Sequence, residues 1–157
     1  MVKINSNSRL LSIKTKIVLT QTDTTVGFLS QNESKLQTIK DRNSSKPFIK
    51  VYKNFKALSH DKKRVPNSKK SLLRRARKTT FIVKELAFRV SDDSLNSSLL
   101  REAKWNYSTS ANEAGKNFKR DFCEEKTDII IEDKNSLFEG SSSSLYRINS
   151  KKIKRLR

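Results

Sequence analysis

The stretch Ser108-Thr109-Ser110-Ala111-Asn112 lies at the end of a strand predicted over residues 105–108. Its hydroxyl and amide side chains can bind the oxygens of a nucleotide or of a metal-bound water. The same residue types are common in turns and helix caps, where they bond to nearby backbone. The stretch therefore predicts either a ligand-binding loop or a structural turn, and the rest of the chain is needed to choose between them.

Two earlier clusters of polar residues also follow apolar segments. The first is Thr22-Asp23-Thr24-Thr25-Val26-Gly27, a predicted turn after a strand at 16–21. The second is Lys40-Asp41-Arg42, at a helix end, followed by Lys46-Pro47. Arginine offers a planar fork of donors to a phosphate, and lysine offers a mobile charge. Each cluster taken alone would be an ordinary turn or a solvated surface.

The other apolar segments predict short strands and helices around these clusters. A helix is expected from Ser30, which has capping-box spacing to Glu33, to about Arg42. Asp92 or Asp93 can begin another that runs to Lys104. The remaining strands are expected at 47–52, 80–83, 86–90 and 128–132 and as a last pair after Gly140, and the remaining helices at 68–78 and 118–124.

The composition indicates one folded domain. A chain of 157 residues is long enough for one compact domain, although only 34% of its residues are apolar and 32% are charged. Three apolar runs of strand length, Ile17-Val18-Leu19, Phe81-Ile82-Val83 and Ile129-Ile130-Ile131, argue against a disordered chain. We therefore expect a single α/β domain with a lean core.

The charge predicts a polyanionic partner. The chain has 35 Lys and Arg against 16 Asp and Glu, a formal charge of +19 and a pI near 10.3. Nucleic acid is favoured over a membrane, because no stretch of about 18 apolar residues could span a bilayer. The alternative is a basic composition inherited from an AT-rich genome, since composition alone does not show a patch.

The single cysteine and the N-terminus concern the compartment. Because Cys123 is the only cysteine, the chain can form neither an intrachain disulfide nor a cysteine-based zinc site. We expect Cys123 to be a small buried apolar residue. Residues 1–16 carry charges where a signal peptide would be apolar. We therefore expect a cytoplasmic protein, with His60 solvated and no metal site built by protein side chains alone.

In combination, these clusters resemble the YrdC-like family, whose pattern runs from Pro-Thr-Asp-Thr-x-Tyr-Gly through Lys-x-Arg and Lys-Pro-Leu to Ser-x-Asn. The resemblance covers residues 16–157 and leaves 1–15 as an N-terminal extension. The matches are Thr22-Asp23-Thr24 with Gly27, Lys40-x-Arg42 with Lys46-Pro47-Phe48, Leu86 to Val90, Ser108 to Asn112 with Gly115, Asp128 to Ile131, Gly140 to Ile148 and Ile153 to Arg155.

The resemblance implies a fold and an activity. The fold would be a single α/β domain, a twisted mixed sheet with flanking helices and an open, concave, basic face. Members with synthase activity are nucleotidyltransferases that convert L-threonine, bicarbonate and ATP into threonylcarbamoyl-AMP and pyrophosphate. Their product serves N6-threonylcarbamoyladenosine modification at position 37 of tRNA, together with partner proteins of the transfer step. Negative charge on the phosphates would be stabilised by Mg²⁺ and positioned cations.

The resemblance also implies residue roles. Thr24, Lys46 and Arg89 would hold threonine or its carbamate. The alternatives are a turn hydroxyl for Thr24, a strand-edge charge for Arg89 and solvated positions for the lysines. The implied nucleotide contacts are Lys40, Arg42, Ser110, Asn112, Thr80, Ser144 and Arg155.

The chain departs from the family pattern in places. Gln21 and Val26 replace the proline and tyrosine of the turn, and Ala76-Arg77-Lys78 replaces Pro-Gly-Pro. Only eight residues separate Thr80 from Arg89, where the family has a longer loop. A non-catalytic module of the same fold that binds tRNA or double-stranded RNA is therefore the alternative function. Its candidate contacts are Arg74, Arg75 and Arg77, with Lys151, Lys152, Lys154, Arg155 and Arg157.

Overall fold

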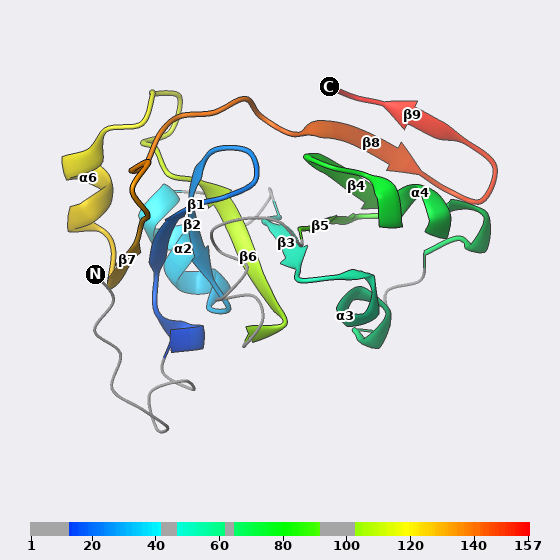
Figure 1. The fold of residues 1–157 in the computed structure, drawn as a ribbon, viewed down its shortest axis with the longest axis horizontal. Coiled ribbons are helices and arrows are strands. Elements are labelled where there is room, and N and C mark those ends of the chain that lie inside the picture. Colours follow the sequence, from blue (N-terminus) through cyan, green and yellow to red (C-terminus); the bar gives the residue numbers. More distant parts are fainter. Residues whose placement is uncertain (1–12, 42–46, 62–64, 92–102) are drawn as a thin grey trace.

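The computed structural model describes residues 13–41, 47–61, 65–91 and 103–157, and these form a single domain built on one mixed sheet (Figure 1). The strand order is β7-β1-β2-β6-β3-β5-β4-β8-β9. This architecture confirms the predicted α/β fold class. The strands are β1 (Val18–Gln21), β2 (Val26–Ser30), β3 (Ile49–Tyr52), β4 (Thr79–Val83), β5 (Leu86–Val90), β6 (Trp105–Ser110), β7 (Ile129–Ile131), β8 (Ser144–Ile148) and β9 (Ile153–Arg155).

The helices are short and flank this sheet. The described ones are α2 (Glu33–Lys40), α3 (Phe55–His60), α4 (Lys70–Arg75), which follows a 3-10 turn η1 (Asn67–Lys69), and α6 (Arg120–Glu125). None of them is long and apolar enough to cross a bilayer. The helix expected to begin at Asp92 or Asp93 falls mostly outside the described residues.

Three sequence-based boundaries were wrong. Asn32, not Ser30, caps α2, and its Oδ1 accepts the amide of Lys35 at 3.1 Å. Ser30 instead ends β2, a strand that the sequence analysis missed. The basic helix ends at Arg75, because Ala76 is extended. β6 continues to Ser110, so part of the expected loop is strand that pairs with β2.

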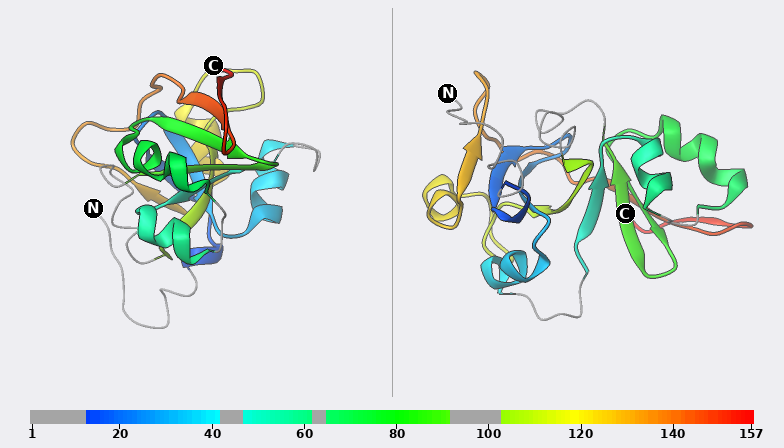
Figure 2. Two further views of the ribbon diagram at one scale, coloured as in Figure 1. Left: turned by 90° about the vertical axis from the view of Figure 1, so that its right-hand side faces the viewer. Right: turned by 90° about the horizontal axis from the view of Figure 1, so that it is seen from below.

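The two faces of the sheet differ because side chains alternate along each strand. On one face, Leu19 and Phe28 belong to an apolar cluster with residues of α2 and α6. Phe81 and Phe88, on the same face, belong to a second cluster with residues of α3 and α4. Figure 2 shows α2 and α6 near one end of the sheet and α3 and α4 near the other. We call this the helix-covered face.

The opposite face carries buried polar side chains, and we call it the polar face. The register pairs Asn106 with Val51 and Val51 with Arg89, which places these three residues in one row across β6, β3 and β5. The antiparallel register of β4 and β5 places Thr80 opposite Arg89. A second row near the other end of β6 contains Ser110, Gly27 and Thr20. Such a face can bind a polar ligand.

The segment between β7 and β8 crosses the molecule past the β1–β2 turn (Figure 1). Val26 N donates to the carbonyl of Phe138 at 3.2 Å, and Gly140 N donates to Thr25 Oγ1 at 3.0 Å. A Cβ at Gly140 would lie 2.0 Å from the carbonyl oxygen of Thr24. Glycine at this position therefore allows the crossing segment to pack directly on the turn.

The eight residues between Thr80 and Arg89 form most of a tight hairpin. β4 and β5 are antiparallel, with Val83 opposite Leu86. Only Lys84 and Glu85 lie between the two strands, and Lys84 has a φ of 56°. The predicted hairpin is therefore confirmed, and it leaves no room for a longer loop at this point.

Candidate ligand-binding site

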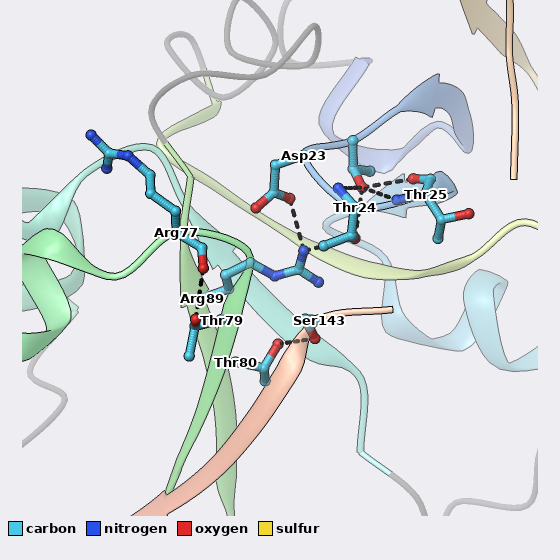
Figure 3. Close-up of polar contacts among 9 residues, drawn as sticks. Asp23, Thr24, Thr25, Arg77, Thr79, Thr80, Arg89 and Ser143 are labelled. Atoms are coloured by element: carbon cyan, nitrogen blue, oxygen red, sulfur yellow. Dashed lines mark hydrogen bonds and ion pairs between the residues drawn. The ribbon is translucent and has the colours of Figure 1, made fainter. Parts of the chain in front are cut away.

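Arg89 forms a buried polar cluster with the β1–β2 turn (Figure 3). Arg89 is only 5% exposed, and its Nη1 donates to Asp23 Oδ1 at 2.8 Å and to Thr24 Oγ1 at 2.9 Å. Strands β6 and β3 lie between β2 and β5 in the sheet. The turn must therefore reach over the polar face toward β5 to make these contacts. The structure thus brings together Thr24 and Arg89, two of the three residues that the resemblance assigned to threonine.

The electrostatics of this cluster favour an anion. Desolvation by burial lowers the pKa of Arg89 below its ordinary value, and the nearby cation of Arg157 adds to this effect. The carboxylate of Asp23 acts in the opposite direction. The charged side chains that act on Arg89 are thus one further guanidinium, that of Arg157, and one carboxylate, that of Asp23. A ligand carboxylate or phosphate near them would offset the excess positive charge.

Three buried polar atoms on the polar face have no hydrogen-bond partner among the described residues: Arg89 Nε, Asn106 Nδ2 and Thr20 Oγ1. Asn106 is 2% exposed, and Thr20 is fully buried. Buried polar atoms are almost always paired, because leaving one unpaired costs about 1–3 kcal/mol. Both nitrogens are donors, so an acceptor-rich ligand on this face would satisfy them. A further unpaired atom, Gln21 Nε2, lies outside these two polar rows, and Glu132 Oε2 is paired with Arg120 at 3.0 Å.

Thr80 adds a second part to the cluster. Its Oγ1 lies 2.9 Å from Ser143 Oγ, and both residues are buried. Arg157 Nε donates to the carbonyl of Ser143 at 3.1 Å. Sequence reasoning gave Ser143 and Asp23 no role, and it placed Arg157 among the candidate RNA contacts and not in this cluster. A run of four serines and a basic tail contain no local signal that selects one position.

Two expected nucleotide contacts lie on the other side of the sheet. The register pairs Ser144 with Thr79 and Arg155 with Tyr146, which places both on the helix-covered face. Arg155 is exposed, and its Nε donates to the carbonyl of Arg157. A shift of one residue along a strand reverses the face. Ser143, one residue before Ser144, therefore contacts Thr80 instead, and Arg157, beyond the end of β9, donates to the carbonyl of Ser143.

Lys40, Ser110 and Asn112 form a second cluster, where α2 and β6 end. Lys40 is 4% exposed, and its Nζ donates to the carbonyl of Ser110 at 3.1 Å and to the carbonyl and Oδ1 of Asn112 at 2.6 and 2.7 Å. Ser110 Oγ lies 2.8 Å from Asn112 Oδ1, and Asn112 Nδ2 donates to the carbonyl of Lys116. An ammonium has three donors. A phosphate would therefore compete with these oxygens for Lys40.

Both clusters border the same pair of strands. Ser110 pairs with Gly27, which lies three residues after Thr24, and Ala111 N donates to the carbonyl of Val26 at 3.0 Å. A Cβ on Gly27 would lie 3.1 Å from the carbonyl oxygen of Thr109. The β2–β6 pair thus connects Thr24, an expected threonine contact, to the expected nucleotide contacts Ser110 and Asn112.

The structure describes some of the other expected residues and leaves two of them out. Arg42 and Lys46 lie outside the described residues. Arg74 and Arg75 are exposed in the last turn of α4. Arg77 is exposed beyond it, and its side chain points away from Arg89 in Figure 3. In the part of the chain that the structure describes, no three His, Cys, Asp or Glu side chains gather into a metal site.

Solved structures share this architecture. A double alanine variant of P. abyssi Sua5 superposes with a TM-score of 0.78 at 19% identity, over 96% of this chain and 52% of that one. P. abyssi Sua5 complexed with L-threonine gives 0.74 at 18%, over 90% and 50%. E. coli YciO gives 0.75 at 16%, over 96% and 86%. Sua5 and YciO belong to the YrdC family.

The chain has a YrdC-like fold. It spans about half the length of the two Sua5 structures and most of YciO. No protein-family model and no curated protein matches its sequence. In this YrdC-like chain, the side chains of the Arg89 and Lys40 clusters are the candidate contacts for a ligand.

Proposed function

We propose that this YrdC-like chain binds L-threonine and ATP on its polar face and joins them with bicarbonate into threonylcarbamoyl-AMP, releasing pyrophosphate. The observation that carries the proposal is the buried guanidinium of Arg89, which contacts Thr24 and leaves Nε unpaired. Arginine binds carboxylates through adjacent N–H donors. Threonine and its N-carboxylate supply such groups, and Sua5, of similar fold, has been crystallised with L-threonine.

The nucleotide would lie along the β2–β6 pair, which connects the Arg89 cluster to the Lys40 cluster. Ser110 and Asn112 would contact it near Lys40, and we assign Arg42 to the nucleotide and Lys46 to threonine only from the sequence pattern. Thr80 and Ser143 would bound the site near Arg157. The contact of Ser143 with Thr80 favours Ser143 over Ser144 for this role, and the contact of Arg157 with Ser143 favours Arg157 over Arg155.

In this proposal, catalysis is electrostatic. Attack of the threonine N-carboxylate on the α-phosphorus would increase negative charge on the phosphates, which positioned cations stabilise. Mg²⁺ would enter with the phosphates, because this ion is commonly held by substrate oxygens and few protein ligands. The product would then serve tRNA modification through partner proteins.

The decisive experiment is a coupled assay of pyrophosphate release. Release should require ATP, L-threonine and bicarbonate together, and Arg89→Gln should abolish this threonine-dependent release. Lys56→Gln, a change of an exposed lysine on α3, is the matched control. Release that does not depend on threonine, or no release with all three substrates, would contradict the proposal.

An RNA-binding module is the second candidate function, and the distribution of charge favours it. Segment 65–84 contains seven Lys and Arg, segment 141–157 contains six, and neither contains Asp or Glu. β4 pairs with β8, and Ser68 Oγ donates to the carbonyl of Ser150 at 3.2 Å, so α4 and the β8–β9 hairpin are neighbours. We call this surface the basic end; Figures 1 and 2 show its elements together.

The basic end fits the phosphates of tRNA or double-stranded RNA. Cations that neutralise phosphates release counterions, which gives affinity with little sequence preference. These two segments lie side by side in the fold, so their cations are concentrated on one part of the surface. This concentration argues against a basic composition that is uniform along the chain. A chain that binds an RNA duplex but releases no pyrophosphate with the three substrates would support this function over the synthase.

A further inference from the structure

Asn106 is the most unusual polar residue of the polar face. It lies inside β6, is 2% exposed, and its Nδ2 has no partner in the described part of the chain. None of the motifs used above contains it. Its side chain points to the same side of the sheet as that of Arg89, because the two residues share one row through Val51.

A purely structural role does not explain this amide. A structural asparagine in a core normally pairs both its donor and its acceptor atoms. Val51, the next residue in the row, is buried and apolar, so the row accepts a residue without polar atoms. An apolar residue of similar size at position 106 would avoid an unpaired donor. The amide is thus a cost to the fold that a ligand contact would offset.

We propose that Asn106 is a recognition residue for the small molecule held by Arg89, donating from Nδ2 to one of its acceptor oxygens. Two strand spacings separate the backbones of the two residues, on the order of 10 Å. The unpaired Nε of Arg89 lies on the same face. A molecule of amino-acid size with a carboxylate for Arg89 and a second acceptor oxygen matches this pair. The inference rests on the proposed function for the identity of that molecule.

The test combines stability and binding in one variant. Asn106→Leu keeps the branched shape of the side chain and removes the unpaired donor, so the melting temperature should rise by about 2–4 °C. Calorimetric affinity for L-threonine should fall by at least about tenfold, the loss expected for one hydrogen bond to a charged group. Asn117→Leu, at an exposed position outside the site, should change neither quantity in this way.

Four outcomes of these measurements would contradict the role proposed for Asn106. A lower melting temperature for Asn106→Leu would show that the amide supports the fold, and would overturn the inference. Unchanged threonine affinity in a folded variant would also overturn it, while leaving the proposed function intact. A wild-type chain that binds neither L-threonine nor ATP would contradict the proposed function together with this role of Asn106. Asn106→Asp, which keeps the size but repels a carboxylate, should also lose affinity for L-threonine, and unchanged affinity in this variant would overturn the inference as well.

Discussion

Arg89 Nη1 lies 2.8 Å from Asp23 Oδ1, and this ion pair joins residues that are 66 positions apart in the chain. Both side chains are largely buried, with 6% and 14% of their surfaces exposed. The pair fixes the β1–β2 turn over the polar face and places Thr24 beside the guanidinium. The geometry of the proposed threonine site therefore depends on Asp23 as well as on Arg89.

Removing the carboxylate should destabilise the fold strongly. Asp23→Ala leaves a buried cation without its partner, which costs about 3–5 kcal/mol in comparable pairs. Asp23→Asn keeps an acceptor and should cost less. Urea unfolding measures both changes, with Asp121→Ala, at an exposed position on α6, as the control. If Asp23→Ala costs no more than the control, the ion pair does not hold the turn.

Gly140→Ala should disturb the β1–β2 turn at the point where the segment between β7 and β8 packs on it. The added Cβ would lie 2.0 Å from the backbone oxygen of Thr24, so either the crossing segment or the turn has to move. Overpacking of this kind costs about 1–3 kcal/mol, and displacement of Thr24 should weaken threonine binding. Thermal unfolding and calorimetry with L-threonine report the two effects. Ser141→Ala, at the exposed next residue, should affect neither.

Lys40 and Asn112 should be energetically coupled. The Lys40 ammonium donates to the backbone and side-chain oxygens of Asn112, so each single alanine variant removes one hydrogen-bond partner from a buried or half-buried group. We expect each to cost about 1.5–3 kcal/mol and the double variant to cost less than their sum by about 1 kcal/mol or more. A double-mutant cycle from urea unfolding measures this coupling. Additive costs would mean that the two side chains act independently.

The basic end should control the salt dependence of RNA binding. If about six phosphates are neutralised, affinity should fall by on the order of a thousandfold between 50 and 200 mM salt. Charge reversal to glutamate at Arg74, Arg75 and Arg77 should lower affinity and flatten this slope in fluorescence anisotropy with an RNA duplex. The control reverses three exposed lysines near α6, Lys119, Lys126 and Lys134. Equal effects of the two triple variants would favour diffuse binding by net charge.

Cys123 should react slowly at pH 8. Its side chain is fully buried in the cluster beneath α2 and α6, and burial raises the pKa of its thiol. A raised pKa means a smaller thiolate fraction at any pH below it, and the thiolate is the reactive form. Alkylation by iodoacetamide should be on the order of 100-fold slower than in urea-unfolded chain, because it requires local opening. Equally fast alkylation of the native chain would contradict the burial of this residue.

The sequence by itself determined the elements with strong local patterns. The apolar runs at Ile17, Phe81 and Ile129 predicted strands, and all three lie in or next to strands of the sheet. The two-residue gap after Val83 predicted the hairpin, because so short a connection permits only antiparallel pairing. The length of the chain and its apolar runs also predicted a single α/β domain. These features depend on near neighbours in the chain, so their signal is local.

Other local features were ambiguous. β2 has Val26, Phe28 and Leu29 between a polar turn and a helix cap, a pattern too short to separate from the turn. The serine and threonine residues at the end of β6 favour a loop in isolation. They become strand because β2 and β3 supply backbone partners on both sides.

Only the tertiary structure decided which residues form the site. The contact of Arg89 with Asp23 and Thr24 depends on how the turn reaches across the sheet, and no local pattern encodes that path. The same holds for the choice of Ser143 over Ser144, because a single residue along a strand reverses the face of the side chain. The sequence determined which residue types are present. The register and the path of the turn determined which of them meet, because both arise from contacts between segments far apart in the chain.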